Sequence, residues 1–264
     1  MRLLQWPSED GLSVSSPNGK FLAALGCHVR PSLETVLHYT SERVKDEGTR
    51  IKCLDFLTKR MGPHGVYQQD YDRLAGARRA KYKIMPCVRL SFLQPDSEKR
   101  ELCSPVECFS DVGCGILCYP VVDPKLDSSA VYGAIFQCRR SPPPDQLLEQ
   151  LLLLVKLAKK MLESVDGTNK KELSDRILKT FSLIFQYLSG QTADFNKTSL
   201  SSLRTVSFIP LANDGGVVEF YRPDQVFFKG SNGGSDSLTE LLFKAVEFSS
   251  FLSAVGVKEE ASVR

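Results

Sequence analysis

The chain has 264 residues, of which 42% are hydrophobic, 34 are Lys or Arg and 31 are Asp or Glu. This composition suits one large or two ordinary globular domains, and the net charge of +3 argues against a dedicated polyanion binder. The N-terminus lacks the apolar core of a signal peptide, and the longest apolar run, Leu151 to Val155, is too short to cross a bilayer. We therefore expect an intracellular protein, cytoplasmic or nuclear, whose eight cysteines are reduced.

The predicted elements of the first half are mainly helices, recognised by apolar residues at helical spacing. Residues 21–26 indicate a helix end closed by Gly26, residues 31–39 and 51–59 are predicted helices, and residues 61–65 form a break. Residues 83–90 (KIMPCVRL) are a predicted strand, in which Pro86 indicates an edge or irregular position.

The second half begins with a proline-rich linker at residues 141–144. Two long helices are predicted at residues 145–162 and 174–189, followed by strands at 206–211 and 217–221 that flank the hairpin turn NDGG. Residues 238–255 are a predicted helix with a break near Val246, closed by Gly256.

An internal repeat organises these elements. Pro86 recurs as Pro210 in a strand, and the motif P-x-x-x-F occurs at residues 105–109 and 223–227. A glycine follows each motif, at Gly133 and Gly256. The fold class is therefore α+β, mainly helical, with two tandem helix-helix-strand-hairpin-helix modules in a solenoid-like or winged-helix-like arrangement. The predicted divisions are residues 1–25 (the tail of a preceding module), 26–132, 133–256, and 257–264 (the start of a further module).

Five strings carry a family resemblance. They are residues 103–126 (CSPVECFSDVGCGILCYPVVDPKL), 142–152 (PPPDQLLEQLL), 184–195 (IFQYLSGQTADF), 206–211 (VSFIPL) and 243–262 (FKAVEFSSFLSAVGVKEEAS). They resemble a domain of unknown function in very large fungal proteins, where that domain follows an N-terminal GHKL ATPase domain of the Hsp90/histidine-kinase kind. The rhythm of the motifs is also similar to the repeats of sacsin-type, chaperone-like proteins.

The resemblance implies a companion ATPase, but this chain carries no equivalent of its nucleotide site. That site needs a helical Asn for Mg²⁺ and the sequence D-x-G-x-G, whereas Asp214-Gly215-Gly216 lacks the second spaced glycine. We therefore predict a chain with no catalytic residue and no cofactor, which is not an enzyme. It is expected to act as a scaffold or interaction region whose partners are neighbouring repeats, a GHKL ATPase domain or protein clients, with no membrane partner.

The cysteines offer one candidate metal site. Cys103, Cys108, Cys114 and Cys118 could bind Zn²⁺ as four thiolates, but their spacing is not that of two CxxC knuckles. Buried, free core cysteines are the preferred interpretation, with metal binding or a redox role as alternatives.

Other catalytic patterns are weak. Cys27 or Cys53 could form a nucleophile pair with His38, which is more typical of a packing residue, and the glycine-rich residues 230–234 lack the lysine of a phosphate-binding loop.

A basic stretch at residues 73–83 gives the alternative function. Arg73, Arg78, Arg79, Lys81 and Lys83 could contact phosphates, as in a nucleic-acid-binding winged-helix-like module. Asp70 and Asp72 lie beside them, so a solvated face is the preferred interpretation and a nucleic-acid partner is not expected.

Overall fold

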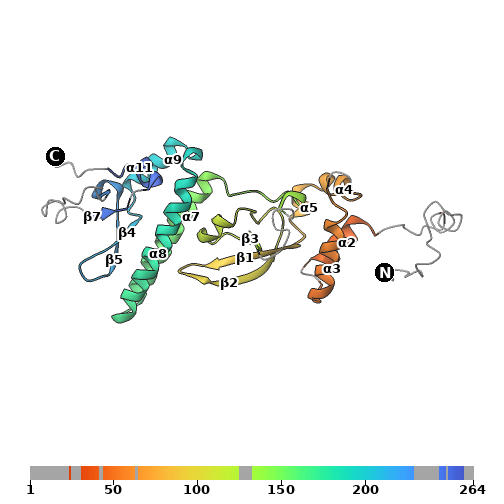
Figure 1. Cartoon of the computed structure of the whole chain (residues 1–264), viewed down its shortest axis with the longest axis horizontal. Coiled ribbons are helices and arrows are strands. Elements are labelled where there is room, and N and C mark those ends of the chain that lie inside the picture. Colours follow the sequence, from red (N-terminus) through yellow and green to blue (C-terminus); the bar gives the residue numbers. More distant parts are fainter. Residues whose placement is uncertain are drawn as a thin grey trace. The chain divides into compact units, whose positions relative to one another are not determined.

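The computed structural model describes residue 24 and residues 31–41, 44–62, 65–124, 133–228, 244–247 and 249–258. These residues form a mainly helical α+β protein with small sheets, which confirms the mainly helical α+β class predicted from the sequence. The chain divides into two compact units, residues 1–78 and 79–264, whose elements are labelled in Figure 1. The predicted tail at 1–25, apart from Ala24, and the glycine-rich residues 230–234 lie outside the described residues.

The first unit is built from short helices with side-chain caps. Helix α2 (Leu33–Thr40) begins at Ser32, whose Oγ accepts the N–H of Thr35 at 3.2 Å. Helix α3 (Glu47–Thr58) begins at Asp46, which accepts the N–H of Thr49 at 2.9 Å. The two helices pack together, and helix α4 (Gln68–Arg73) follows. The helices predicted at 31–39 and 51–59 are thus confirmed.

The described residues of the second unit form two long helices and three small sheets. Its elements, after α5 (Gly76–Arg79) at the junction of the units, are β1 (Met85–Ser91), β2 (Gln94–Cys103), the 3₁₀-helix η2 (Val112–Leu117), β3 (Val121–Val122), α7 (Pro144–Ser164), α8 (Thr168–Gly190), η3 (Thr192–Asp194), α9 (Lys197–Ser202), η4 (Leu203–Thr205), β4 (Ile209–Ala212), β5 (Val218–Tyr221), η5 (Pro223–Gln225), β6 (Val226–Phe228), β7 (Lys244–Val246) and α11 (Ser250–Val255).

The main core of the second unit surrounds α7 and α8. Phe181, Phe185, Phe208 and Phe251 are buried there, with ring centroids 6.0–6.3 Å apart between neighbours. Aromatic rings at such separations add to the free energy gained from their buried area. The apolar spacing along 145–162 and 174–189 therefore predicted the two helices correctly.

Strand β1 lies in the middle of its sheet, in the order β2-β1-β3. Of the two positions inferred from Pro86, the edge strand is therefore wrong and the irregular position is right, because the pairing of β1 with β3 begins only at Cys87. Pro86 pairs with Leu102 of β2 and accepts the N–H of Asp123 on the other side at 3.0 Å. Proline has no N–H to return that second hydrogen bond, and β3 ends at Val122. Pro86 is tolerated because its missing donor faces the end of a two-residue strand.

A second correction concerns residues 238–255. Among the described residues of this segment, only 250–255 are helical. Residues 244–246 instead form β7, which pairs in parallel with β6. Gly256 ends α11 in the left-handed conformation, with φ of +109°, as the sequence predicted.

Two segments of the second unit share one main-chain hydrogen-bond pattern. We call residues 84–124 with 133–139 the first β-module, and residues 208–228 with 244–258 the second β-module. In the first, Met85 pairs with Cys103 across a hairpin, and in the second Ile209 pairs with Tyr221. Each of these hairpins ends two residues before the proline of P-x-x-x-F.

The motif itself folds in the same way in both modules. In the first module, the N–H of Glu107 donates to the carbonyl of Ser104, the residue before the motif proline, at 3.0 Å. In the second, the N–H of Gln225 donates to the carbonyl of Arg222 at the same distance. The motif phenylalanine then forms a parallel bridge with a downstream segment, Phe109 with Arg139 and Phe227 with Lys258.

The downstream segments form matching turns, which we call closing turns. In the first, Cys138 donates its N–H to Gly133 at 2.9 Å, and in the second Val257 donates to Leu252 at 3.0 Å. The left-handed residue is Gln137 in one and Gly256 in the other, so Gln137, and not Gly133, is the counterpart of Gly256. Gly133–Arg139 thus belongs with the strands before it, although the predicted division fell at 132/133.

The hairpin of the first β-module reaches into the main core. Leu93 at its tip is buried among the side chains of α7 and α8, and the rings of Phe92 and Phe181 meet edge to face at 6.3 Å. Leu93 has φ of +63°, an unusual value for a residue with a side chain. Burial of Leu93 offsets the free energy of this backbone conformation.

Candidate thiol cluster

Four cysteines of the first β-module lie in one buried layer. Cys87 is on β1, Cys103 ends β2, Cys108 precedes the motif phenylalanine, and Cys138 is in the closing turn. Cys87, Cys103 and Cys108 are buried, Cys138 is half-buried, and all four are free thiols. Strand pairing gathers these residues, because β2 pairs with β1, and the closing turn bridges to Phe109, which in turn bridges to β3 beside β1.

Cys108 lies at the centre of the layer, with its Sγ 3.6 Å from that of Cys138. Hydrogen bonds from Cys138 and Cys87 lower the pKa of the Cys108 thiol. Hydrogen bonds with Cys103 and Cys108, together with burial, raise the pKa of Cys87, and a hydrogen bond with Cys108 and burial raise the pKa of Cys138.

The two other cysteines of the predicted set lie elsewhere. Cys114 packs with Val88, Phe109 and Val121 in a separate cluster, where burial raises its pKa to about 12. Cys118 ends η2 in the left-handed conformation, and burial raises its pKa as well. Of the four cysteines proposed from the sequence, the structure brings only Cys103 and Cys108 into the layer.

In the part of the chain that the structure describes, no three His, Cys, Asp or Glu side chains are placed to hold a metal ion. The sequence-based reasoning also missed Cys87 and Cys138. The sequence signal for Cys87 was its place directly after the strand proline Pro86, whereas Cys138 carried none, because the left-handed conformation of Gln137 before it is known only from the structure.

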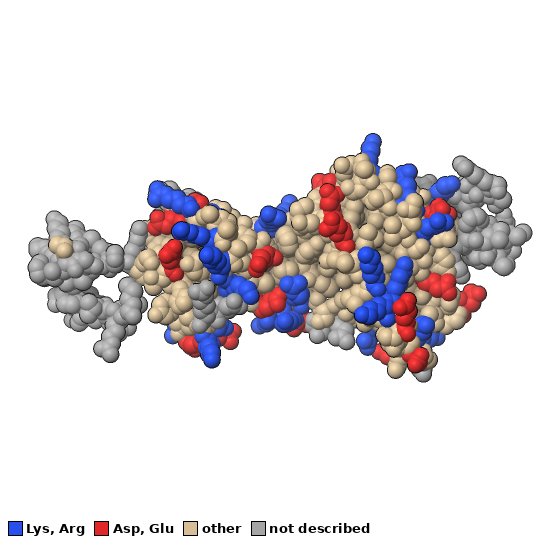
Figure 2. Space-filling model, turned by 180° about the vertical axis from the view of Figure 1, so that it is seen from behind, with Lys and Arg blue, Asp and Glu red and all other residues tan. Residues whose placement is uncertain are grey.

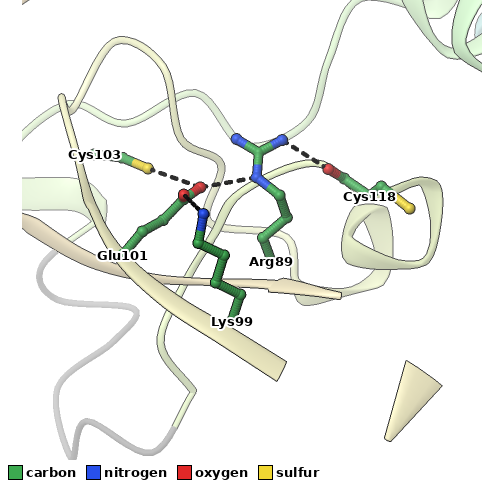
Figure 3. A network of polar contacts seen from close by, with 5 residues as sticks. All are labelled: Arg89, Lys99, Glu101, Cys103 and Cys118. Carbon is green, nitrogen blue, oxygen red and sulfur yellow. Dashed lines mark hydrogen bonds and ion pairs between the residues drawn. The ribbon is translucent and has the colours of Figure 1, made fainter. Parts of the chain in front are cut away.

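A polar network borders the thiols on the β1–β2 sheet (Figure 3). Arg89 Nε donates to Glu101 Oε1 at 2.8 Å, and its terminal nitrogen donates to the carbonyl of Cys118 at 3.0 Å. Cys103 Sγ lies 3.8 Å from the same oxygen of Glu101, and Lys99 lies on the other side of that carboxylate. The hydrogen bond from Arg89 lowers the pKa of Glu101, so this carboxylate stays charged beside the thiols.

The basic stretch is divided between the two units and largely engaged. Arg73 lies 3.9 Å from Asp70, Arg78 lies 3.9 Å from Glu34, and Arg79 donates to Gln137 at 2.6 Å. On the face seen in Figure 2, lysines and arginines alternate with acidic residues. At least three of the five basic side chains thus have a partner within the protein.

The Cys–His alternative gains nothing from the geometry. His38 is exposed on α2, where its ring meets that of Tyr39 at 5.7 Å, and Cys53 is half-buried on α3. Cys27 lies outside the described residues. Among the described helices, none is long and apolar enough to span a membrane.

These observations define a class: a mainly helical α+β protein whose β-modules are closed by a parallel bridge, one of them lined with thiols. A family model described as "Protein of unknown function (DUF3684)" matches residues 1–264, so the chain belongs to that family. No curated protein and no solved structure matches the chain.

Proposed function

We propose that the chain is a non-catalytic scaffold region of a large chaperone-like protein, built from repeated units that bury their apolar surfaces against one another. In the proposal, the region holds or relays protein clients beside a GHKL-type ATPase domain. The link to that ATPase derives from the sequence resemblance, and the scaffold role derives from the packing of the two β-modules.

One observation carries the scaffold role. The hairpin tip of the first β-module is buried in the core formed by α7 and α8, the two helices that precede the second β-module in the chain. Leu93 is 3% exposed there, and Leu117 of η2 joins the same core with no exposed surface. In arrays of repeats each unit contacts its neighbours and completes their cores. The matching hydrogen bonds of the two β-modules support the same interpretation.

The packing is tested by removing the tip side chains, with Phe92→Ala and Leu93→Ala in one full-length variant. We expect hydrogen exchange to show loss of protection in β1 and β2 at lower denaturant than in α7 and α8, because the shared core is broken. Ser91→Ala, an exposed change in the same hairpin, is the control and should leave protection unchanged. A variant in which strands and helices still lose protection together would contradict the proposal.

The non-catalytic role has its own test. Calorimetric titration with Mg-ATP and a phosphate-release assay on the full chain should show neither binding nor turnover. Turnover above the buffer rate by chromatographically pure chain would overturn this part of the proposal.

A further inference from the structure

Cys108 and Cys138 are held side by side by the main chain. Phe109 and Arg139 form a parallel bridge, and the N–H of Ser110 donates to the carbonyl of Arg139 at 3.0 Å. In parallel strands, residues that precede a bridged pair by one position are also neighbours and point to the same face. The two sulfur atoms accordingly lie 3.6 Å apart.

The second β-module shows that packing alone does not require thiols at these positions. The residue before Phe227 is Val226, and the residue before Lys258 is Val257. Each valine is 4% exposed and belongs to the main core. A pair of valines thus fills the place that the first β-module gives to a pair of cysteines.

We propose that Cys108 and Cys138 form a peroxide-sensitive modification site, at which hydrogen peroxide converts the two thiols into a disulfide. The bond would join the P-x-x-x-F segment of the first β-module to its closing turn. This inference rests on the geometry of the pair and is independent of the proposed scaffold function.

The atoms balance over two steps. One sulfur of the pair, as thiolate, attacks a peroxide oxygen, the O–O bond breaks, and a sulfenic acid and one water form. The second sulfur then attacks the first, the S–O bond breaks, and the oxygen leaves as a second water with the remaining proton. Two thiols are oxidised by two electrons, and one hydrogen peroxide is reduced to two waters.

The surroundings suit this chemistry. A disulfide needs a sulfur separation of about 2.05 Å, which side-chain rotation can reach from adjacent positions. Cys138 is only half-buried, so peroxide can approach the pair from its side. The hydrogen bonds that lower the pKa of Cys108 favour the thiolate that such reactions require. Cys87, also next to Cys108, supplies the competing partner that the experiment must separate.

The test treats the folded, full-length chain with hydrogen peroxide, blocks free thiols and maps the peptides without reduction. Trypsin combined with a glutamate-specific protease separates Cys103 from Cys108 at Glu107, and fragment ions distinguish Cys108 from Cys114 and Cys118. We expect a Cys108–Cys138 linked peptide, the loss of two thiols per chain, and a rise in Tm of about 5–10 °C. Dithiothreitol should reverse all three changes.

The double variant Cys108→Val with Cys138→Val installs the pair found in the second β-module, so it should fold and show no peroxide-dependent Tm rise. Cys53→Ser, in the other compact unit, should leave the linked peptide intact. A chain that forms no disulfide, or that links Cys108 to Cys87 or to a second chain, would overturn the inference.

Discussion

The two β-modules have the same main-chain frame but different interiors. In both, a hairpin leads to P-x-x-x-F, and the phenylalanine bridges to a closing turn. The prolines that bracket the hairpin are 19 residues apart in the first module and 13 in the second. The thiols of Cys108 and Cys138 are replaced by the valines Val226 and Val257. The frame therefore depends on a few turn and bridge positions, while the interior can change chemistry when volume and apolar character are kept.

The hairpins also differ in what they contact. The longer hairpin of the first module places Phe92 and Leu93 in the main core. The shorter hairpin of the second module is joined to α8 through Ser174, whose Oγ accepts the N–H of Val218 at 3.0 Å. Both hairpins contact Phe181 of α8, through Phe92 in the first module and Phe220 in the second.

The largest expected effect comes from the position just before the first strand of each module, which is Ile84 before β1 and Phe208 before β4. Phe208→Ala should lower the free energy of unfolding by about 3–5 kcal/mol, because Phe208 is fully buried between Phe185 and Phe251. Ile84→Ala, at the matching position, should cost about 2–4 kcal/mol, because its side chain is smaller. Urea unfolding at constant m-value measures both.

Leu153→Ala is the control for these changes, since Leu153 is 56% exposed and its loss should alter stability by less than about 0.5 kcal/mol. A larger loss of unfolding free energy for Ile84→Ala than for Phe208→Ala would contradict the expectation that the larger side chain stabilises its module more.

The next effect tests how η2 of the first module packs on α8. A Cβ on Gly113 would lie 2.7 Å from the ring of Tyr187, whose hydroxyl donates to Asp111 at 3.1 Å. Gly113→Ala should therefore destabilise the protein by about 1–3 kcal/mol through overpacking. Gly190→Ala is the control, because a Cβ there meets nothing within 4 Å. Equal stability of the two variants would show that η2 does not need this close approach.

A smaller difference is expected between the closing turns. Gly256→Ala should cost about 1–2 kcal/mol, because φ of +109° is unfavourable for any residue with a side chain. Gln137→Gly relaxes the equivalent position but removes the hydrogen bond from Arg79, so its net effect should stay within about 1 kcal/mol. Thermal unfolding of both variants measures the contrast, and a neutral Gly256→Ala would contradict it.

The smallest effect is pH-dependent and belongs to the first module. Burial raises the pKa of Cys114 to about 12 from its ordinary value of 9.0, so the folded state holds this proton more tightly than the unfolded state. Its contribution to the free energy of unfolding is therefore fully present below pH 9 and is lost as the pH rises toward 12. The expected loss at pH 10 is about 1 kcal/mol.

Unfolding midpoints at pH 8, 9 and 10 measure this slope. Cys114→Ser keeps a donor for the carbonyl of Asp111 but has no titrating thiol, so its midpoints should fall less steeply. An identical slope in the variant would assign the pH dependence to other groups, such as Tyr119, whose pKa burial raises to about 12.

Much of the fold was predictable because it depends on local signals. Apolar spacing located α7 and α8, and Asn213, whose side chain accepts the N–H of Gly215, formed the predicted turn. Strand β7 was not predictable, because it has only three residues and is defined by its parallel pairing with β6, which its own sequence does not show. Of the two positions predicted for Pro86, the edge was wrong and the irregular position was right, and the sequence could not decide between them because the extent of β3 is a tertiary property.

The candidate site was only half predictable, for a related reason. Proximity in the sequence groups Cys103 and Cys108 with Cys114 and Cys118. The sheet instead gathers residues on one face, which brings in Cys87 from β1 and Cys138 from the closing turn. Alternation along a strand and the return of a distant segment decide which thiols meet, and neither follows from the spacing of the cysteines alone.

The parallel bridge from Phe109 to Arg139 has a practical consequence for dissecting the protein. A fragment ending at residue 132 would leave the N–H groups of Ser110 and Asp111 without the carbonyl acceptors that Arg139 and Arg140 supply. Such a piece would expose an open strand edge and invite self-association. A fragment boundary placed after Arg140, just before helix α7, keeps Phe109 and its bridge partner Arg139 on the same polypeptide.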